Sequence, residues 1–325
     1  MRIGMFLPHV GVFGGVRRYL ELGNEWTALG HAVTLYHPEG TPPAWLAFDG
    51  LTAPLAAAAS APSDLAFCGD AGTYAAFRAH AARQHVYYCV LEGDPGLPAA
   101  LADPAVVLMA NSGPLREQLR RRSRRGVLDG VGGIRPERFH SDVSQRAATP
   151  LRVLVNGRRS RAKKGTDLVL RALRGLAGHA PPFETVLFDA VDAATNRQDP
   201  RDGAPLPPDA RFVLNPSQDE LVALYQSSHV FVAAERKAGW CNTALEALAC
   251  GCALVCTRSG TADFARDRDN ALVTLRHPWF LRRAVRELLT EPSLRDRLSA
   301  AGPASAAPWA WAALARKILG QLPSA

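Results

Sequence analysis

The amino-acid sequence predicts an α/β protein of two doubly wound domains, each built on a parallel sheet with helices on both faces. Short apolar runs alternate with segments of helical spacing along the whole chain, which is the pattern of parallel sheets. At 141–150 the composition turns polar, and a fresh apolar run beginning at Leu151 starts a second series of the same kind. We therefore expect an N-terminal domain at 1–147 and a C-terminal domain at 148–325, facing each other across a cleft.

Composition and charge exclude several classes of protein. A chain of 325 residues with 47% hydrophobic and 21% charged residues is globular rather than disordered. No run approaches the roughly 20 apolar residues of a membrane span, and the N-terminus lacks the pattern of a signal peptide, so we expect a cytoplasmic protein. The net charge of +8 favours an anionic partner: a nucleic acid, a lipid headgroup or a nucleoside diphosphate. The six cysteines lack zinc-site spacing and are expected to be buried free thiols.

The first half begins with a β-α-β unit. Its strands are predicted at 2–7 and 32–36, and the helix between them, at 16–29, ends at Gly30. Further apolar runs predict strands at 65–68, 86–91 and 106–110 and a helix at 74–82.

The second half repeats this alternation of strand and helix. Strands are predicted at 151–155, 185–188, 212–214, 230–233 and 253–256, and helices at 166–176, 218–226, 242–250, 280–289 and 293–300. The segment 190–208, rich in Asp, Asn and Pro, is predicted to be a long exposed loop. The last helix, at 309–320, is a candidate to pack back on the N-terminal domain.

Two predicted loops precede helices and are therefore candidate anion sites. The loop between the strand at 230–233 and the helix at 242–250 presents a helix N-terminus, with Asn242 as the predicted N-cap residue. The turn at 8–16 contains glycines that allow the backbone to approach a ligand closely. A dinucleotide site there would need G-x-G-x-x-G, which is absent although Glu39 lies near the end of the second strand. A tight turn that binds nothing is the remaining alternative.

Two segments are strongly basic. The loop 157–166 carries five cations after the first strand of the second half, and it is not a P-loop because its lysine precedes its glycine. Arginine and lysine there suit phosphate, and the alternative is a solvated loop. The run from Arg116 to Arg125 is predicted to be helical, either as a solvated face or as a contact with an anionic membrane or a charged acceptor. It lacks interleaved aromatic residues, so nucleic acid is not expected.

Several segments follow the order seen in glycosyltransferase family 4. They are Phe13-Gly14-Gly15-Val16-Arg17-Arg18-Tyr19, Leu29-Gly30-His31-Ala32-Val33, Asn111-Ser112, Gly157-Arg158 with Lys164-Gly165, and Gly239-Trp240-Cys241-Asn242 leading to Leu245-Glu246-Ala247-Leu248-Ala249-Cys250-Gly251. The chain resembles these retaining, metal-independent GT-B enzymes over nearly its whole length. The last segment is the most specific, because Leu-Glu-Ala-x-Ala-Cys-Gly after a Gly-aromatic pair is rarely met elsewhere.

The resemblance implies a transferase that moves a hexose-like sugar from a nucleoside diphosphate to an acceptor hydroxyl, without a cofactor or metal. The acceptor would be a glycoconjugate, a polysaccharide or a natural product. Glu246 would accept hydrogen bonds from the ribose hydroxyls, and the alternative is a helix residue satisfied by the helix dipole. Lys164 with either Arg158 or Arg159 would neutralise the departing diphosphate. The other implied donor-binding residues are Gly14, Gly15, Gly239, Trp240, Cys241, Asn242 and Thr243.

Two positions depart from the family pattern. Ala238 stands where the family usually carries a glutamate that contacts the donor sugar, and Glu235 is the candidate to replace it. The histidine usual after the fourth strand is missing, which leaves His9 and Glu92 as acceptor-side candidates. These departures keep open a catalytically impaired sugar-nucleotide-binding subunit, and the basic run from Arg116 to Arg125 keeps open a protein that binds nucleic acid or anionic lipid.

Overall fold

The computed structural model describes residues 1–191, 199, 201, 206–207 and 210–322, and the chain forms two compact units. Unit 1 contains Met1–Gly133 and the C-terminal segment from Trp311, and unit 2 contains Ile134–Ala310. The sequence places the boundary later, after residue 147. Residues just before that position pack within unit 2, because the Arg146 guanidinium donates to the carbonyls of Gln226 (3.1 Å) and Cys250 (2.8 Å).

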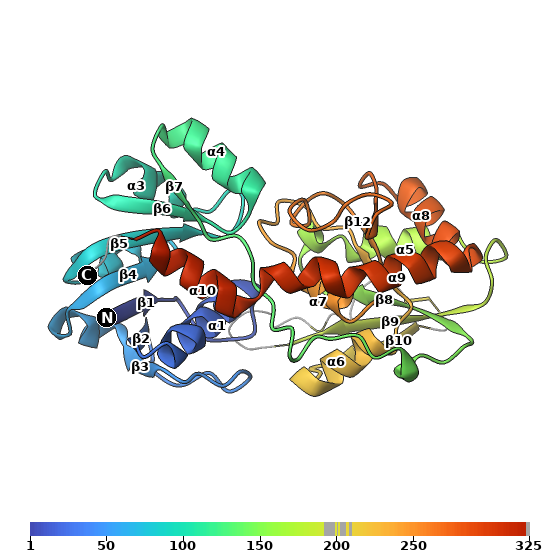
Figure 1. Ribbon diagram of the computed structural model, residues 1–325, viewed down its shortest axis with the longest axis horizontal. Helices are drawn as coiled ribbons and strands as arrows, with labels where there is room; N and C mark the ends of the chain where they lie inside the picture. Colours follow the sequence, from blue (N-terminus) through green and yellow to red (C-terminus); the bar gives the residue numbers. More distant parts are fainter. Residues whose placement is uncertain (192–198, 200, 202–205, 208–209, 323–325) are drawn as a thin grey trace. The chain divides into compact units, whose positions relative to one another are not determined.

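A parallel sheet forms the centre of unit 1 (Figure 1). Its seven strands lie in the order β3-β2-β1-β4-β5-β6-β7, and every pairing between them is parallel. The strands are β1 Arg2–Phe6, β2 Ala32–His37, β3 Leu51–Pro54, β4 Ser63–Cys68, β5 Ala82–Cys89, β6 Val106–Ala110 and β7 Val127–Asp129. The α-helices are α1 Gly14–Ala28, α2 Tyr74–Ala79, α3 Leu97–Ala102, α4 Gly113–Ser123 and α10 Trp311–Gly320.

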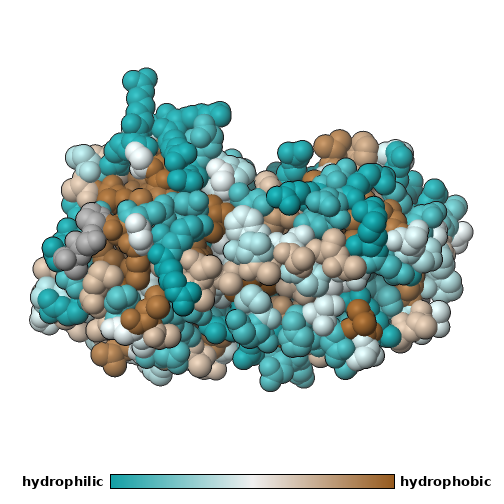
Figure 2. All heavy atoms as spheres, viewed as in Figure 1, coloured by the Kyte–Doolittle hydropathy of each residue, from teal (hydrophilic) through white to brown (hydrophobic). Residues whose placement is uncertain are grey.

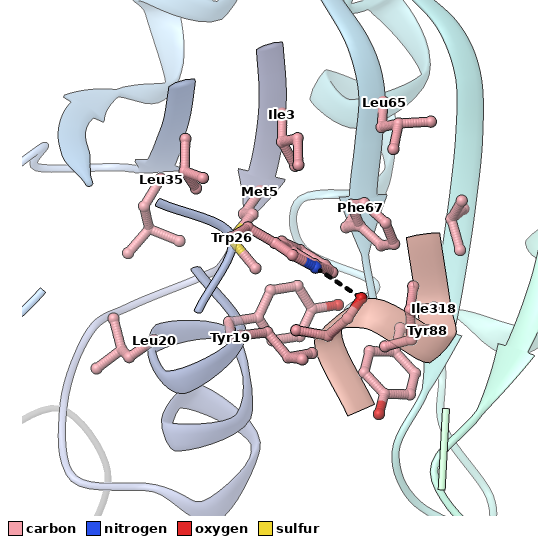
Figure 3. Packing of buried hydrophobic residues seen from close by; sticks show 14 of the residues in the cluster. Ile3, Met5, Tyr19, Leu20, Trp26, Leu35, Leu65, Phe67, Tyr88 and Ile318 are labelled. Carbon is pink, nitrogen blue, oxygen red and sulfur yellow. Dashed lines mark hydrogen bonds between the residues drawn. The ribbon is translucent and has the colours of Figure 1, made fainter. Parts of the chain in front are cut away.

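The C-terminal helix α10 lies beside α1 on one face of this sheet (Figure 1). Trp26 of α1 donates from its indole nitrogen to the carbonyl of Ala315 in α10, at 3.2 Å (Figure 3). Ile318 packs in the same buried cluster as Met5 and Phe67 of the sheet. The last helix is therefore part of the core of unit 1.

Unit 2 contains a second parallel sheet, of six strands in the order β10-β9-β8-β11-β12-β13. The strands are β8 Leu151–Asn156, β9 Phe183–Asp189, β10 Ala210–Leu214, β11 Val230–Ala233, β12 Ala253–Cys256 and β13 Ala271–Val273. The α-helices are α5 Thr166–Arg174, α6 Gln218–Gln226, α7 Asn242–Ala249, α8 Pro278–Thr290 and α9 Pro292–Ala306. The strand order reverses between β8 and β11, and open α/β sheets bind ligands at the carboxyl ends of the strands at such a point.

The predicted fold class is confirmed, with differences in individual elements. The short strands β3, β7 and β13 were not predicted. The helix predicted at 74–82 ends at Ala79 because β5 begins at Ala82, before the apolar run that marks this strand in the sequence. The predicted loop 190–208 lies largely outside the described residues.

Figure 2 shows hydrophilic residues over much of the visible face, while apolar side chains fill clusters on the faces of the sheets. Among the described helices, none combines the length and apolar character that a membrane span requires.

Helix α9 runs past its predicted end at residue 300 because Gly302 allows close packing. A Cβ atom built at Gly302 would collide with the carbonyl oxygen of Leu248 in α7. Replacing Gly302 by alanine is therefore expected to lower the free energy of unfolding by about 1–3 kcal/mol, measured by denaturant unfolding. The control is Gly320→Ala in α10, where a Cβ meets nothing within 4 Å. Equal stability of Gly302→Ala and the wild type would contradict the close packing of α7 and α9.

Candidate functional site

Two loops of unit 2 meet at the carboxyl ends of adjacent strands. The loop after β8 and the loop after β11 leave the same edge of the sheet because these strands pair in parallel. The backbone N–H of Arg236 donates to the carbonyl of Lys163 at 2.8 Å, which joins the two loops. Gly165 has a φ of +76°, and a Cβ there would collide with the carbonyl of Ala234. A glycine is thus required for the loops to approach this closely.

This approach brings Lys164 and Glu235 into contact. The Lys164 ammonium lies 2.7 Å from a carboxylate oxygen of Glu235, whose side chain is 8% exposed. The Cys241 thiol donates to the same oxygen at 3.3 Å. Burial acts to lower the pKa of Lys164, but the charge of Glu235 outweighs it and the pKa is raised above the usual 10.5. Lys164 is therefore protonated at neutral pH and forms an ion pair with Glu235.

The two arginines of the loop after β8 have different partners. Arg158 lies against the end of β9, where its guanidinium donates to Asp189 (2.9 Å) and to the carbonyl of Ala190 (3.2 Å). Burial raises the pKa of Asp189, while the charge of Arg158 opposes this shift. Arg159 donates from Nε to Asp167 at the start of α5, at 2.9 Å. Its Nη1 is buried and has no hydrogen-bond partner within the described residues, so Arg159 retains a donor for a ligand.

The N-terminus of α7 differs from the prediction in one detail. Cys241, not Asn242, is the N-cap residue, and no side chain caps the helix. The backbone explains this: the Cys241 N–H donates to the carbonyl of Gly260 at 2.8 Å, outside the helix, and its carbonyl accepts the first helical bond, from Leu245. The Asn242 side-chain oxygen is buried and lacks a hydrogen-bond partner in the described part of the chain.

The residues around this helix end contribute in different ways. The Trp240 ring packs against Phe264 and Trp309, with ring centroids 5.1 and 5.4 Å away. The side chain of Trp240 therefore packs in the interior, and its backbone forms part of the loop. The Thr243 hydroxyl lies 3.5 Å from the Cys241 thiol. Gly239 is buried in the same loop.

Glu246 lies one turn further along α7 and is buried. The Tyr225 hydroxyl donates to the Glu246 carboxylate at 3.0 Å. Tyr225 belongs to α6, and its ring packs against Phe188 of β9 and Phe231 of β11. This contact was missed in the sequence, where Tyr225 is one more apolar position of a predicted helix. A buried carboxylate next to a tyrosine hydroxyl is oriented for a second set of donors.

The candidates of the first half all lie in unit 1. Helix α1 begins at Gly14, and no side chain caps it at Phe13. His9 follows β1 and accepts at Nδ1 from the Gly11 N–H at 3.3 Å. Gly15 and Glu92 follow β1 and β5 in the chain, so all four candidates, Gly14, Gly15, His9 and Glu92, belong to the carboxyl edge of the first sheet.

Some arginines of the basic run Arg116–Arg125, which begins in α4 and extends two residues beyond it, contact other residues of unit 1. Arg116 pairs with Asp129 at 3.2 Å, and Arg125 donates to backbone carbonyls, including those of Asp103 (2.8 Å) and Ala100 (3.0 Å). Contact of the remaining arginines with an anionic membrane stays a prediction.

The six cysteines were predicted to be buried free thiols. All six cysteines are free and buried, as predicted. Within the described ranges, no cluster of three or more His, Cys, Asp or Glu side chains is placed to hold a metal ion.

Comparison with known proteins connects this geometry to a family. A family model described as "Glycosyl transferases group 1" matches residues 137–305, and no curated protein sequence matches the chain. Among solved structures, sucrose-phosphate synthase from Thermosynechococcus elongatus is similar with a TM-score of 0.76 and 17% identity, covering 98% of this chain and 97% of that chain.

Two other solved structures are similar over comparable lengths. HepE from Anabaena in complex with UDP-glucose gives a TM-score of 0.75 at 16% identity and 99% coverage of both chains. A glycosyltransferase from Rickettsia africae gives 0.73 at 14% identity, covering 98% of this chain and 97% of that chain. The two Rossmann-like parallel-sheet domains are those of GT-B glycosyltransferase structures.

Proposed function

The chain belongs to the glycosyl transferases of group 1, and from this premise we propose that it moves a hexose-like sugar from a nucleoside diphosphate to an acceptor hydroxyl with retention at the anomeric carbon. The observation that carries the proposal is the Lys164–Glu235 pair, linked through Cys241 to the uncapped N-terminus of α7. A cation and a helix N-terminus together suit a diphosphate. HepE, whose structure contains UDP-glucose, supports a nucleotide sugar as the donor.

Each candidate residue has a role in this proposal. Lys164 neutralises the diphosphate as it leaves, with Arg159 as the nearby cation that retains a donor. Backbone N–H groups of residues 239–243 and Gly14–Gly15 bind the diphosphate and sugar, and Glu246 accepts from the ribose. His9 and Glu92 bind the acceptor side. Arg158 positions the loop after β8 through Asp189.

The reaction we propose needs little from a protein base. The bond between the anomeric carbon and the diphosphate oxygen breaks, and the acceptor oxygen bonds to that carbon on the same face. The acceptor proton passes to the departing diphosphate. The protein contributes orientation and stabilisation of the charge that develops on the diphosphate. Lys164 and Arg159 supply this charge in the place of a divalent metal.

Binding and turnover test the proposal separately. Thermal shift against a panel of nucleoside diphosphate sugars identifies the donor, because a ligand of the folded state raises the midpoint. The anomeric configuration of the product, read from NMR coupling constants, decides retention, and turnover in EDTA decides metal independence. Inversion, or a loss of turnover that Mg²⁺ or Mn²⁺ restores, would overturn the corresponding part.

A second function is favoured by Ala238, which stands where the resemblance expects a carboxylate. Its N–H donates to the Ser259 hydroxyl at 2.9 Å, and its methyl group offers no polar contact to a sugar. The chain would then be a subunit that binds a sugar nucleotide without transferring the sugar. Donor binding without turnover across a range of acceptors would support this function.

Replacing Tyr225 by phenylalanine is expected to raise KM for the donor about two- to tenfold and leave kcat unchanged. The hydroxyl orients Glu246, and a lost hydrogen bond of about 0.5–1.5 kcal/mol gives that range. Steady-state kinetics measure it. The matched control is Tyr74→Phe in unit 1, which removes a buried hydroxyl with no hydrogen-bond partner among the described residues. An unchanged donor KM in Tyr225→Phe would show that the tyrosine does not position Glu246.

A further inference from the structure

A cavity of ≈ 400 Å³ opens beside the Lys164–Glu235 pair within unit 2. It lies at the carboxyl ends of β11, β12 and β13, and Glu235 forms part of its wall. Three arginines line it: Arg236, Arg258 and Arg276. The cavity is thus next to the proposed donor site but is lined by a different set of cations.

Two acidic residues line the cavity beside the three arginines. Glu235 pairs with Lys164 at 2.7 Å. The Asp267 carboxylate accepts from the Val273 N–H at 2.9 Å, which holds it against the strand β13. Within the part of the chain that the structure describes, neither Arg236 nor Arg258 has an ion pair with a carboxylate. The cavity therefore carries an excess of positive charge.

Arg276 is held at the cavity by hydrogen bonds to backbone carbonyls. Its guanidinium donates to the carbonyls of Ala234 (2.9 Å) and Ala162 (3.2 Å), which holds it against the two loops of the candidate site. Burial, together with the charge of Arg236, lowers the pKa of Arg276. Arg276 is thus held at the cavity by backbone carbonyls, while the exposed side chains of Arg236 and Arg258 also line it.

The remaining polar wall of the cavity consists of hydroxyl groups, from Thr257, Ser259 and Thr274. Guanidinium groups bind phosphate and carboxylate oxygens with paired hydrogen bonds, and hydroxyls add further donors. We infer that this cavity binds an oxyanion, a phosphate or a carboxylate, next to the donor site. The anion is either free in solution or carried by the sugar of the bound nucleotide, and this second source rests on the proposed function.

The first experiment uses inorganic phosphate alone, with the full chain. Calorimetric titration is expected to give saturable binding that weakens about tenfold in Arg236→Gln and again in Arg258→Gln, since each substitution removes a charge-assisted hydrogen bond to the anion, and a tenfold change corresponds to about 1.4 kcal/mol. Arg286→Gln, an exposed arginine of α8 outside the cavity, is the matched control and is expected to bind like the wild type. Chloride at equal ionic strength controls for screening.

The second experiment distinguishes the two sources by comparing UDP-glucuronate with UDP-glucose. Tighter binding of UDP-glucuronate that disappears in the Arg236→Gln/Arg258→Gln double variant assigns the anion to the sugar. Equal binding of the two, with phosphate binding that depends on the arginines, assigns the site to a free anion. If neither phosphate nor UDP-glucuronate binding changes in the double variant, the inference is overturned. If no nucleotide sugar binds at all, the proposed function fails while the phosphate titration still decides this inference.

Discussion

Replacing Lys164 by alanine is expected to lower kcat at least about 100-fold, because in the proposed reaction Lys164 neutralises the departing diphosphate. The substitution also leaves Glu235, 8% exposed, without its partner. Removing one partner of a buried pair costs about 3–5 kcal/mol, and the low end applies here because Lys164 is 24% exposed. Steady-state kinetics and denaturant unfolding measure the two effects.

A double variant separates catalysis from stability at this position. Lys164→Ala combined with Glu235→Gln removes both charges, so most of the lost stability is expected to return while turnover stays low. The neighbouring Lys163→Ala is the matched control, since Lys163 lies in the same loop, and its kcat is expected to change less than about threefold. An equal loss of kcat in Lys163→Ala would mean that turnover depends on the total positive charge of the loop and not on the position of Lys164.

The pH dependence of this pair follows from the raised pKa of Lys164. Its contribution to stability is complete below the unfolded value of 10.5 and is lost as the pH rises through the raised value in the folded state. The stability difference between the wild type and the double variant is therefore expected to stay constant from pH 6 to pH 9. A difference that shrinks within this interval would contradict a permanently charged Lys164.

Replacing Glu246 by alanine is expected to weaken nucleoside diphosphate sugar binding about 10- to 100-fold. The ribose hydroxyls would lose their carboxylate acceptor, an interaction of about 1.5–3 kcal/mol, and the Tyr225 hydroxyl would lose its acceptor. The specific measurement is discrimination between ribose and deoxyribose nucleotides, which is expected in the wild type and is expected to be lost in the variant. Glu246→Gln, which keeps an acceptor oxygen, is expected to fall between the two. Unchanged affinity in Glu246→Ala and Lys164→Ala together would refute the transferase proposal.

The central strands could be predicted from sequence because both of their faces are buried. The strands β11 and β12 lie at their predicted bounds, and β8 is longer by one residue, Asn156. The missed strands β3, β7 and β13 lie at sheet edges, where they pair on one side only. Their three or four residues carry no periodicity of their own, so their assignment depends on the neighbouring strand.

The meeting of the two loops was predictable, but the contacts between their side chains were not. The rule that parallel strands end at one edge brings the loops after β8 and β11 together. Which cation meets which carboxylate depends on the path of each loop. The sequence left Arg158 and Arg159 equivalent, whereas the structure places Arg158 on Asp189 and Arg159 on Asp167. The contact of Tyr225 with Glu246 depends on how α6 packs against α7, which no local pattern reports.

The return of α10 to unit 1 has a consequence for the order of events during synthesis. Unit 2 is one continuous segment and has all its residues once Ala310 has left the ribosome. Unit 1 begins earlier but lacks the Ala315 carbonyl and the Ile318 side chain that complete the environment of Trp26. The half that is translated first therefore cannot complete its core until the last helix has been synthesised, after unit 2 has all its residues.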